Sequence, residues 1–286
     1  MDLPNFLLGQ DDEDEVRQMI EALPPGSSEY DAEGLDAEDV EELLQRHLSI
    51  APAIEHIDSV GKQHNMDQYV VFKNMAPDAI RNFSNKKHLG HIKDFTDHCL
   101  IIVMPSREHE VAASIFQRFV FLKLDEMRPD FSLNLKPCGT AEVQGATRGK
   151  GPDVSYLPRT LPAARSDKWP SLVLEVGYSE SATKLRNDAS WWLTESQGEV
   201  RVVATLTIFR NHRVHLEVWK LREGAHPHPI KTQEAIVTKS AHGYSASAAL
   251  VIHFPELFLR DPTDNGERDI VFNREDLEQL VESVLE

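Results

Sequence analysis

The sequence predicts an α/β fold, a small mixed sheet flanked by helices, and three observations indicate it. Alternating apolar residues mark two short strands, at residues 153–157 and 171–176. A helix at 184–196 and a strand at 200–208 follow them directly. Before them, Ser106 caps a long helix whose wide apolar face continues to Met127. We therefore expect a sheet built on strands 153–157 and 171–176, with helices packed against it.

Two carboxylates belong to this pair of strands. Asp153 begins the first strand, and Glu175 lies near the end of the second, on the face opposite Leu172, Leu174 and Val176. If the strands are neighbours, both carboxylates project to the same side at one end of the sheet. Hard carboxylate oxygens, with water and phosphate oxygens, are what Mg²⁺ or Mn²⁺ prefers. The pattern predicts a Mg (or Mn) site at Asp153 and Glu175.

A glycine-rich turn, residues 145–151, comes directly before Asp153 and carries Arg148 and Lys150. These two bases flank the predicted metal end, where the phosphate of a nucleic acid would lie. The turn has no Walker pattern, so its glycines are equally typical of a hairpin.

The same stretch resembles a known superfamily, the PD-(D/E)XK restriction-endonuclease-like fold, and in particular its Uma2-like branch and similar uncharacterised fungal proteins. The resemblance covers roughly Pro105 to Lys220. Its carriers are Pro152-Asp153, Leu174-Glu175-Val176, Ser179-Glu-Ser181, the helix from Lys184 to Ser196 and the strand from Val200 to Ile208. One departure is clear: the family pattern is Glu-x-Lys, and this chain has Glu175-Val176-Gly177.

The resemblance implies a restriction-endonuclease-like core and a Mg²⁺-dependent phosphodiester hydrolase that acts on nucleic acid. Asp153 and Glu175 would bind the metal, which would activate water. Lys184 is the nearest cation that could replace the missing lysine, and Arg186 is the second and a candidate for nucleic-acid binding with Arg148 and Lys150.

The long helix offers two further candidates. In such folds the helix before the active strands can donate another acid to the metal, and Glu110 is the expected residue, with Glu108 beside it. His109 lies in register with Ala112 and Phe116 on the apolar face, which is typical of a core histidine as well as of a site residue.

Composition and charge indicate the cellular compartment and the kinds of partner that we expect. Two cysteines, outside any zinc-type spacing, exclude a disulfide framework and indicate an intracellular, cytoplasmic or nuclear protein. No apolar run approaches the ~20 residues of a membrane span, so we expect no membrane partner. The net charge is −17, but residues 1–50 hold 15 acids and two bases, so the rest carries only −4.

We therefore expect two parts: residues 1–50 as an acidic N-terminal arm, partly disordered or made of peripheral helices, and residues 51–286 as the nuclease-like domain. The arm would solvate the chain, mimic nucleic acid or bind a protein partner. Within the domain, the run from Arg81 to Lys93 contains six basic or histidine residues and predicts a solvated loop. At the C-terminus, Asn273 and Asp276 resemble a capping box, and the helix that follows is either a lid on the core or a face for a homodimer.

Two alternatives to hydrolysis stay open. Because Gly177 replaces the family's lysine, the chain could be a catalytically lapsed nuclease fold that serves as a nucleic-acid or protein binding module. Asp153 and Glu175 could also be ordinary acids at strand ends, paired with Arg148 or Lys150. A serine hydrolase fits poorly, because the run from Gly177 to Ser181 lacks the final glycine of GxSxG.

Overall fold

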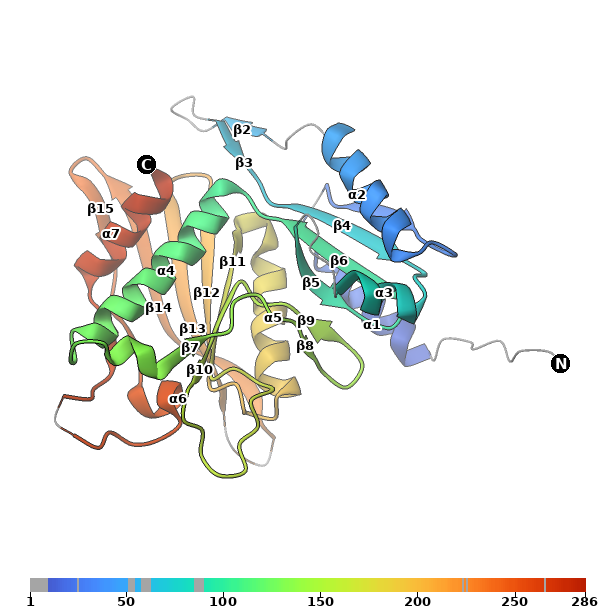
Figure 1. Ribbon diagram of the computed structural model, residues 1–286. Coiled ribbons are helices and arrows are strands. Elements are labelled where there is room, and N and C mark those ends of the chain that lie inside the picture. Colours follow the sequence, from blue (N-terminus) through green and yellow to red (C-terminus); the bar gives the residue numbers. More distant parts are fainter. Residues whose placement is uncertain are drawn as a thin grey trace.

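The computed structural model describes residues 10–24, 26–50, 55–57, 63–84, 90–222, 224, 226–264 and 266–286. Two mixed β-sheets, each flanked by helices, form the chain (Figure 1). The α/β class and the helix-flanked mixed sheet predicted from the sequence are confirmed. The sheets have seven and six strands, so they are larger than the small sheet that was expected.

The seven-stranded sheet contains both strands that carry the acid pair. Its order is β15–β14–β13–β12–β11–β10–β7, and β11 and β12 are parallel because helix α5 connects them, whereas every other pair is antiparallel. The strands are β7 (Leu135–Pro137), β10 (Val154–Pro158), β11 (Leu172–Tyr178), β12 (Val202–Phe209), β13 (Arg213–Arg222), β14 (His228–Ser240) and β15 (Gly243–Ala246).

Helices cover both faces of this sheet (Figure 1). One face packs against α4 (Arg107–Asp125), α6 (Phe254–Phe258) and α7 (Arg274–Leu285), and the other packs against α5 (Ala182–Glu195). The alternation predicted for β11 is confirmed: Leu172, Leu174 and Val176 lie in the first core, whereas Val173 packs with the tryptophans of α5. Glu175 therefore faces α5.

Local capping explains where the long helices begin. Ser106 accepts a hydrogen bond from the His109 backbone and starts α4, as the sequence predicted. Asn273 and Asp276 form the predicted capping box at the start of α7. The apolar side chains of α7 are buried in the core beneath it, so this helix is a lid on the core.

The six-stranded sheet lies beside the first one and has the order β1–β4–β6–β5–β9–β8. Met19 of α1 (Gln10–Glu21) packs on one face, and α2 (Ala37–Ile50) and α3 (Pro77–Ser84) cover the other. Its strands are β1 (Ser28–Asp31), β4 (Gln68–Lys73), β5 (His91–Phe95), β6 (Cys99–Met104), β8 (Val143–Gln144) and β9 (Gly149–Lys150).

Residues 28–50 are part of this unit, which differs from the peripheral arm expected for residues 1–50. Strand β1 pairs in parallel with β4, and Val40 and Leu44 of α2 are fully buried between the helix and the sheet. Burying such side chains stabilises each by roughly 1.5–3 kcal/mol, which holds the acidic segment on the body. The first nine residues lie outside the described part of the chain, as do Lys86, Lys87 and His88 of the expected basic loop.

The remaining elements are short. They are the hairpin β2 (Glu55–Ile57) and β3 (Gln63–Asn65), the pair β16 (Leu250–Ile252) and β17 (Ile270–Phe272), and the 3₁₀ turns η1 (Phe131–Asn134) and η2 (Ser179–Ser181). Within the described ranges, no helix has the length and apolar character that a membrane crossing requires.

The two sheets are joined where β9 leads into β10. Only three residues separate these strands, and the Gly151 backbone N–H donates to the Lys93 carbonyl of β5 over 3.2 Å. This junction holds strand β5 of the smaller sheet against the β10–β11 pair of the larger one.

Candidate functional site

Asp153 and Glu175 lie next to each other at the junction of the two sheets. Strands β10 and β11 are antiparallel, with Val154 opposite Leu174, so Asp153 precedes β10 at the level of Glu175. Both residues are buried: Asp153 is 8% exposed and Glu175 is 0% exposed. The sequence therefore predicted correctly that these strands are neighbours and that their acids share one side.

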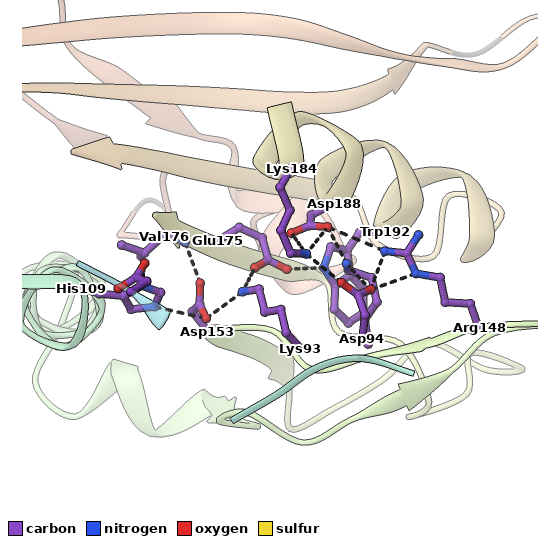
Figure 2. Close-up of polar contacts among 12 residues, drawn as sticks. Lys93, Asp94, His109, Arg148, Asp153, Glu175, Val176, Lys184, Asp188 and Trp192 are labelled. Atoms are coloured by element: carbon purple, nitrogen blue, oxygen red, sulfur yellow. Dashed lines mark hydrogen bonds and ion pairs between the residues drawn. The ribbon is translucent and has the colours of Figure 1, made fainter. Parts of the chain in front are cut away.

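Lys93 of β5 lies between the two carboxylates (Figure 2). Its ammonium donates to Asp153 Oδ1 over 2.8 Å and also to Glu175 Oε2. The lysine is 1% exposed. The sequence placed this residue at the end of a solvated basic loop, and that interpretation is wrong for Lys93, because the residue lies in a buried strand.

A β-bulge explains why Lys93 reaches the acids. The register between β5 and β6 shifts between Ile92 and Asp94, so Lys93 is the extra residue of the bulge. Bulges change the direction of side chains relative to a regular strand. Lys93 and Asp94 are adjacent in the chain, and both are buried. Lys93 donates to Asp153 beside the larger sheet, and Asp94 accepts from Lys184 of helix α5.

The other carboxylate oxygens of the pair are also hydrogen bonded. Asp153 Oδ2 accepts from the Val176 backbone N–H over 2.7 Å, and Glu175 Oε1 accepts from Trp192 Nε1 over 2.6 Å. His109 Nε2 lies 3.3 Å from Asp153 Oδ1. All four oxygens of the pair therefore face donors that belong to the protein.

His109 connects the pair to a third acid, Asp67. Its Nδ1 lies 2.9 Å from Asp67 Oδ2, and Asp67 Oδ1 accepts from the backbone of Ser106, the residue that caps α4. Burial by itself would lower the pKa of His109, but Asp153 and Asp67 raise it to about 10. The imidazole is consequently a second buried cation beside Asp153 at neutral pH.

A second cluster continues the network along α5. Lys184 donates to Asp94 Oδ2 over 2.7 Å and to Asp188 Oδ2 over 2.9 Å, and Lys150 donates to Oδ1 of both acids. Arg148 adds a contact from its Nε to Asp94 Oδ1 over 2.8 Å. Three cations therefore surround two carboxylates.

The whole network contains five acids and five bases. The acids are Asp67, Asp94, Asp153, Glu175 and Asp188, and the bases are Lys93, His109, Arg148, Lys150 and Lys184. Ionised groups with so little exposure are tolerated only when they are paired and hydrogen bonded. The network therefore has the character of a structural interface that fixes the two sheets relative to each other.

The pKa values follow from the competition between burial and pairing. Burial would lower the pKa of Lys93, but Asp153 and Glu175 raise it well above its usual range. Burial would raise the pKa of Asp153, but Lys93 and His109 lower it below its usual range. For Glu175, burial dominates over Lys93 and raises the pKa to about 7. Burial also lowers the pKa of Lys150 to about 8, although Asp188 and Asp94 act to raise it.

The arrangement does not fit the divalent metal that the sequence suggested. A metal between Asp153 and Glu175 would take the position of the Lys93 ammonium and would need oxygens that now accept from Lys93, Val176 and Trp192. In the described part of the chain, no group of three or more His, Cys, Asp or Glu side chains could hold a metal ion. As folded here, the acid pair is neutralised by protein cations.

Two other predicted site residues lie away from the acid pair. Lys184 contacts Asp94 and Asp188, so it does not take the role of the missing lysine; Lys93 is the cation at Glu175. Glu110 is exposed, and its carboxylate lies 3.8 Å from His91 Nε2, so it does not complete a shell around Asp153 and Glu175. The preceding residue, His109, faces the pair.

The three predicted nucleic-acid contacts also differ from expectation. Lys150 is fully buried, and Arg148 donates to Asp94, so both bases neutralise acids of the network. Arg186 is exposed on α5 and donates to Thr183 Oγ1 over 3.2 Å. A hollow of ≈320 Å³ under α1 reaches Arg148, Lys184 and Asp188, but its lining does not include Asp153 or Glu175.

The glycines before Asp153 serve close packing. A Cβ on Gly149 would lie 2.1 Å from the Phe95 ring, and one on Gly151 would lie 2.2 Å from the Ile92 carbonyl oxygen. These positions need glycine because β9 and the residues after it approach β5 closely. The hairpin interpretation of the glycine-rich turn agrees with the pairing of β8 and β9.

No family model matches the sequence, and no curated protein matches it. Among solved structures, the chain matches a protein from Anabaena variabilis that is described as belonging to DUF820 and proposed to be a nuclease. The identity is 11%, the TM-score is 0.40, and the match covers 72% of this chain and 99% of that chain. DUF820 is the Uma2 family.

Proposed function

We propose that this chain is a nuclease-like binding module that does not hydrolyse phosphodiesters. One observation carries the proposal: the Lys93 ammonium lies between Asp153 and Glu175, where a nuclease of this type would need its metal. The β10–β11 pair brings the two acids together, and Lys93 neutralises them.

Burial supports the same conclusion. Hydrolysis requires that water and a phosphodiester reach the acids, but Glu175 is 0% exposed and Lys93 is 1% exposed. The residues that would hold the phosphate, Arg148 and Lys150, already compensate Asp94 and Asp188. Ion pairs within the chain therefore take up both the position expected for the metal and the side chains expected to contact phosphate.

The acidic N-terminal segment suggests the chemistry of the partner. Exposed acids on β1, on α2 and between them include Glu29, Glu33, Glu38, Asp39 and Glu42. Because α2 is anchored by Val40 and Leu44, these acids form a fixed surface on the body. Such a surface attracts a protein with a basic face and repels nucleic acid. We therefore favour a protein partner.

Binding to a fluorescent basic peptide, such as an oligolysine, tests this surface by anisotropy at several salt concentrations. Replacing Glu33, Glu38 and Glu42 by Gln is expected to weaken binding more than replacing Asp261 by Asn together with Glu275 and Glu282 by Gln. The second variant is a matched control, because its exposed acids lie on the loop after α6 and on α7. An equal loss of peptide affinity in the two triple variants would mean that only the net charge matters and would contradict a defined acidic contact surface.

The second candidate is the Mg²⁺- or Mn²⁺-dependent nuclease acting on nucleic acid. One observation favours it: Asp153 and Glu175 converge on a single cation from neighbouring strands, between α4 and α5. That convergence is the arrangement a metal-dependent phosphodiesterase uses, although the cation here is a lysine.

A cleavage assay separates the two candidates. Plasmid DNA, single-stranded DNA and RNA are incubated with the wild type in Mg²⁺ or Mn²⁺, with Asp153→Asn/Glu175→Gln as the background control. We expect the wild type to cleave no faster than the double variant. Metal-dependent cleavage by the wild type that disappears in a folded double variant would establish the nuclease and reject the module.

A further inference from the structure

We infer that a groove at the end of the seven-stranded sheet where β11 and β12 begin binds a peptide segment, and that Arg201 anchors an acidic side chain of that peptide. The groove has a volume of ≈930 Å³ and lies between the segments 162–165, 197–201 and 255–261. Figure 1 shows α6 and the loop from β10 to β11 at this end of the sheet. The described lining includes none of the residues of the ion network, so the inference goes beyond the proposed function and does not depend on it.

Ion pairs and hydrogen bonds fix the walls of the groove. Arg165 Nη1 donates to Glu199 Oε2 over 2.8 Å, and its Nη2 donates to the Trp169 carbonyl over 2.7 Å. These contacts tie the loop before β11 to the segment after α5. Lys220 of β13 donates to Glu256 Oε1 of α6 over 2.6 Å and ties two further walls together. A groove whose walls are already held in place loses little conformational freedom when a ligand binds.

Arg201 gives the groove an unpaired positive charge. The charged residues of the lining are four bases, Arg165, Arg201, Lys220 and Arg260, and three acids, Glu199, Glu256 and Asp261. Three of the bases form ion pairs, with Glu199, Glu256 and Glu267 respectively for Arg165, Lys220 and Arg260. Arg201 is exposed, and no described residue forms an ion pair with it.

Arg201 also lies close to Arg165. Burial lowers the pKa of Arg165, Glu199 raises it, and the positive charge of Arg201 lowers it further. Two neighbouring guanidinium groups therefore share one internal acid, Glu199. A ligand carboxylate at this position would supply the missing negative charge, and guanidinium groups bind carboxylates through paired hydrogen bonds.

The remaining lining residues favour a peptide over nucleic acid. Aliphatic side chains and prolines, among them Val200, Leu221 and Leu259, suit the aliphatic side chains of a peptide. The described lining contains no aromatic ring on which a base could stack, and one unpaired arginine is too little for a phosphate backbone. Glu256 Oε2 is buried and accepts no hydrogen bond from the described residues, which is unusual for a buried acceptor. A peptide backbone N–H would supply the donor that this wall lacks.

The experiment measures fluorescence anisotropy with a fluorescein-labelled octapeptide in which Glu alternates with Leu, and with a matched octapeptide that has Gln in place of each Glu. Alternation lets a Glu side chain meet Arg201 in more than one register of the peptide. The net charge of −17 disfavours the Glu peptide elsewhere on the chain, so a preference for it reports a local basic site. We expect the wild type to prefer the Glu peptide by at least about tenfold, a typical contribution of a hydrogen bond to a charged group. Arg201→Gln should bind the two peptides equally.

Two further variants keep the result specific. Arg118 of α4 is also exposed and forms no ion pair with a described residue, so Arg118→Gln removes the same charge and should keep the preference for the Glu peptide. Ala163 is an exposed residue of the lining, and Ala163→Trp places a large side chain there that should weaken the binding of both peptides.

The inference is overturned by a wild type that shows no preference for the Glu peptide, by a preference that persists in Arg201→Gln, or by peptide affinities that Ala163→Trp leaves unchanged. A labelled octadeoxynucleotide that binds through Arg201 more tightly than the Glu peptide would assign the groove to nucleic acid instead. The proposed function is tested separately, because oligolysine should bind the acidic surface of β1 and α2 equally well in Arg201→Gln. Failure of oligolysine binding with an intact Glu preference would reject that surface and leave the groove standing.

Discussion

Trp192 donates its indole N–H to Glu175 Oε1 over 2.6 Å. The tryptophan belongs to the buried face of α5 and packs edge-on against Trp191 and Trp169. The same residue is therefore both part of a packed aromatic cluster and a hydrogen-bond donor to one of the two central acids. This contact links the apolar core under α5 to the ion network.

Replacing Trp192 by Phe should destabilise the chain by about 1–3 kcal/mol, the typical cost of leaving a buried acceptor without its donor. The phenyl ring keeps much of the packing, so the missing donor is the main change. Urea unfolding measures the effect. Trp191→Phe is the control, because Trp191 packs in the same cluster and its ring also lies under Arg148 and Lys150, but it donates no hydrogen bond to Glu175. Equal destabilisation in both variants would mean that packing, not the hydrogen bond, dominates.

Stability should fall as pH rises from about 4.5 to 7, owing to Glu175. Burial raises its pKa to about 7, so the folded chain keeps this proton in a range where the unfolded chain has released it. Glu175→Gln cannot ionise and should lose less stability than the wild type in this window; the loss that remains above about pH 6 comes from His109, whose raised pKa keeps its proton in the folded chain. The difference in unfolding free energy between variant and wild type should change by at most about 1.4 kcal/mol per pH unit, measured by urea unfolding at several pH values.

Asp153→Asn is the control for that pH window. Lys93 and His109 offset burial and hold the pKa of Asp153 below its usual range, so this carboxylate is ionised in both states above about pH 5. Its own titration therefore adds no slope between pH 5 and 7, and any slope that its substitution produces reports the pKa values of Glu175 and His109, which Asp153 raises. A slope equal to that of Glu175→Gln would assign the effect to the network as a whole.

Lys184→Ala should destabilise the chain by about 3 kcal/mol or more, because it removes a buried partner from Asp94 and Asp188. Arg186→Ala, two residues later on the same helix, should change stability by less than about 0.5 kcal/mol, since Arg186 is exposed. Chemical denaturation of both variants checks the contrast. Similar stabilities of the two variants would show that Lys150 and Arg148 are enough to neutralise Asp94 and Asp188.

Leu44→Ala should cost about 2–5 kcal/mol, because Leu44 of α2 is fully buried against the smaller sheet. Leu43→Ala is the matched control: this neighbour is only partly buried and should cost roughly half as much or less. Urea unfolding compares them. A negligible effect of Leu44→Ala would mean that residues 28–50 are only loosely attached, as the sequence by itself suggested.

Much of the larger sheet follows from local patterns. Alternation in β11, the Ser106 and Asn273 caps and the order of strands around α5 depend on residues close together in the chain, and each was predicted. The proximity of Asp153 and Glu175 was predictable for the same reason, because antiparallel neighbours bring their acids together.

The tertiary structure alone decided what neutralises those acids. Lys93 lies 60 residues before Asp153 and 82 before Glu175, in a segment whose charge is typical of a solvated loop. Asp94 meets Lys184 across 90 residues in the same way. A charged side chain is buried only where distant partners compensate the loss of hydration, and no local pattern records such partners. The sequence by itself therefore determined the strands and the acid pair, whereas the packing of one sheet against the other determined that a lysine, not a metal, lies between them.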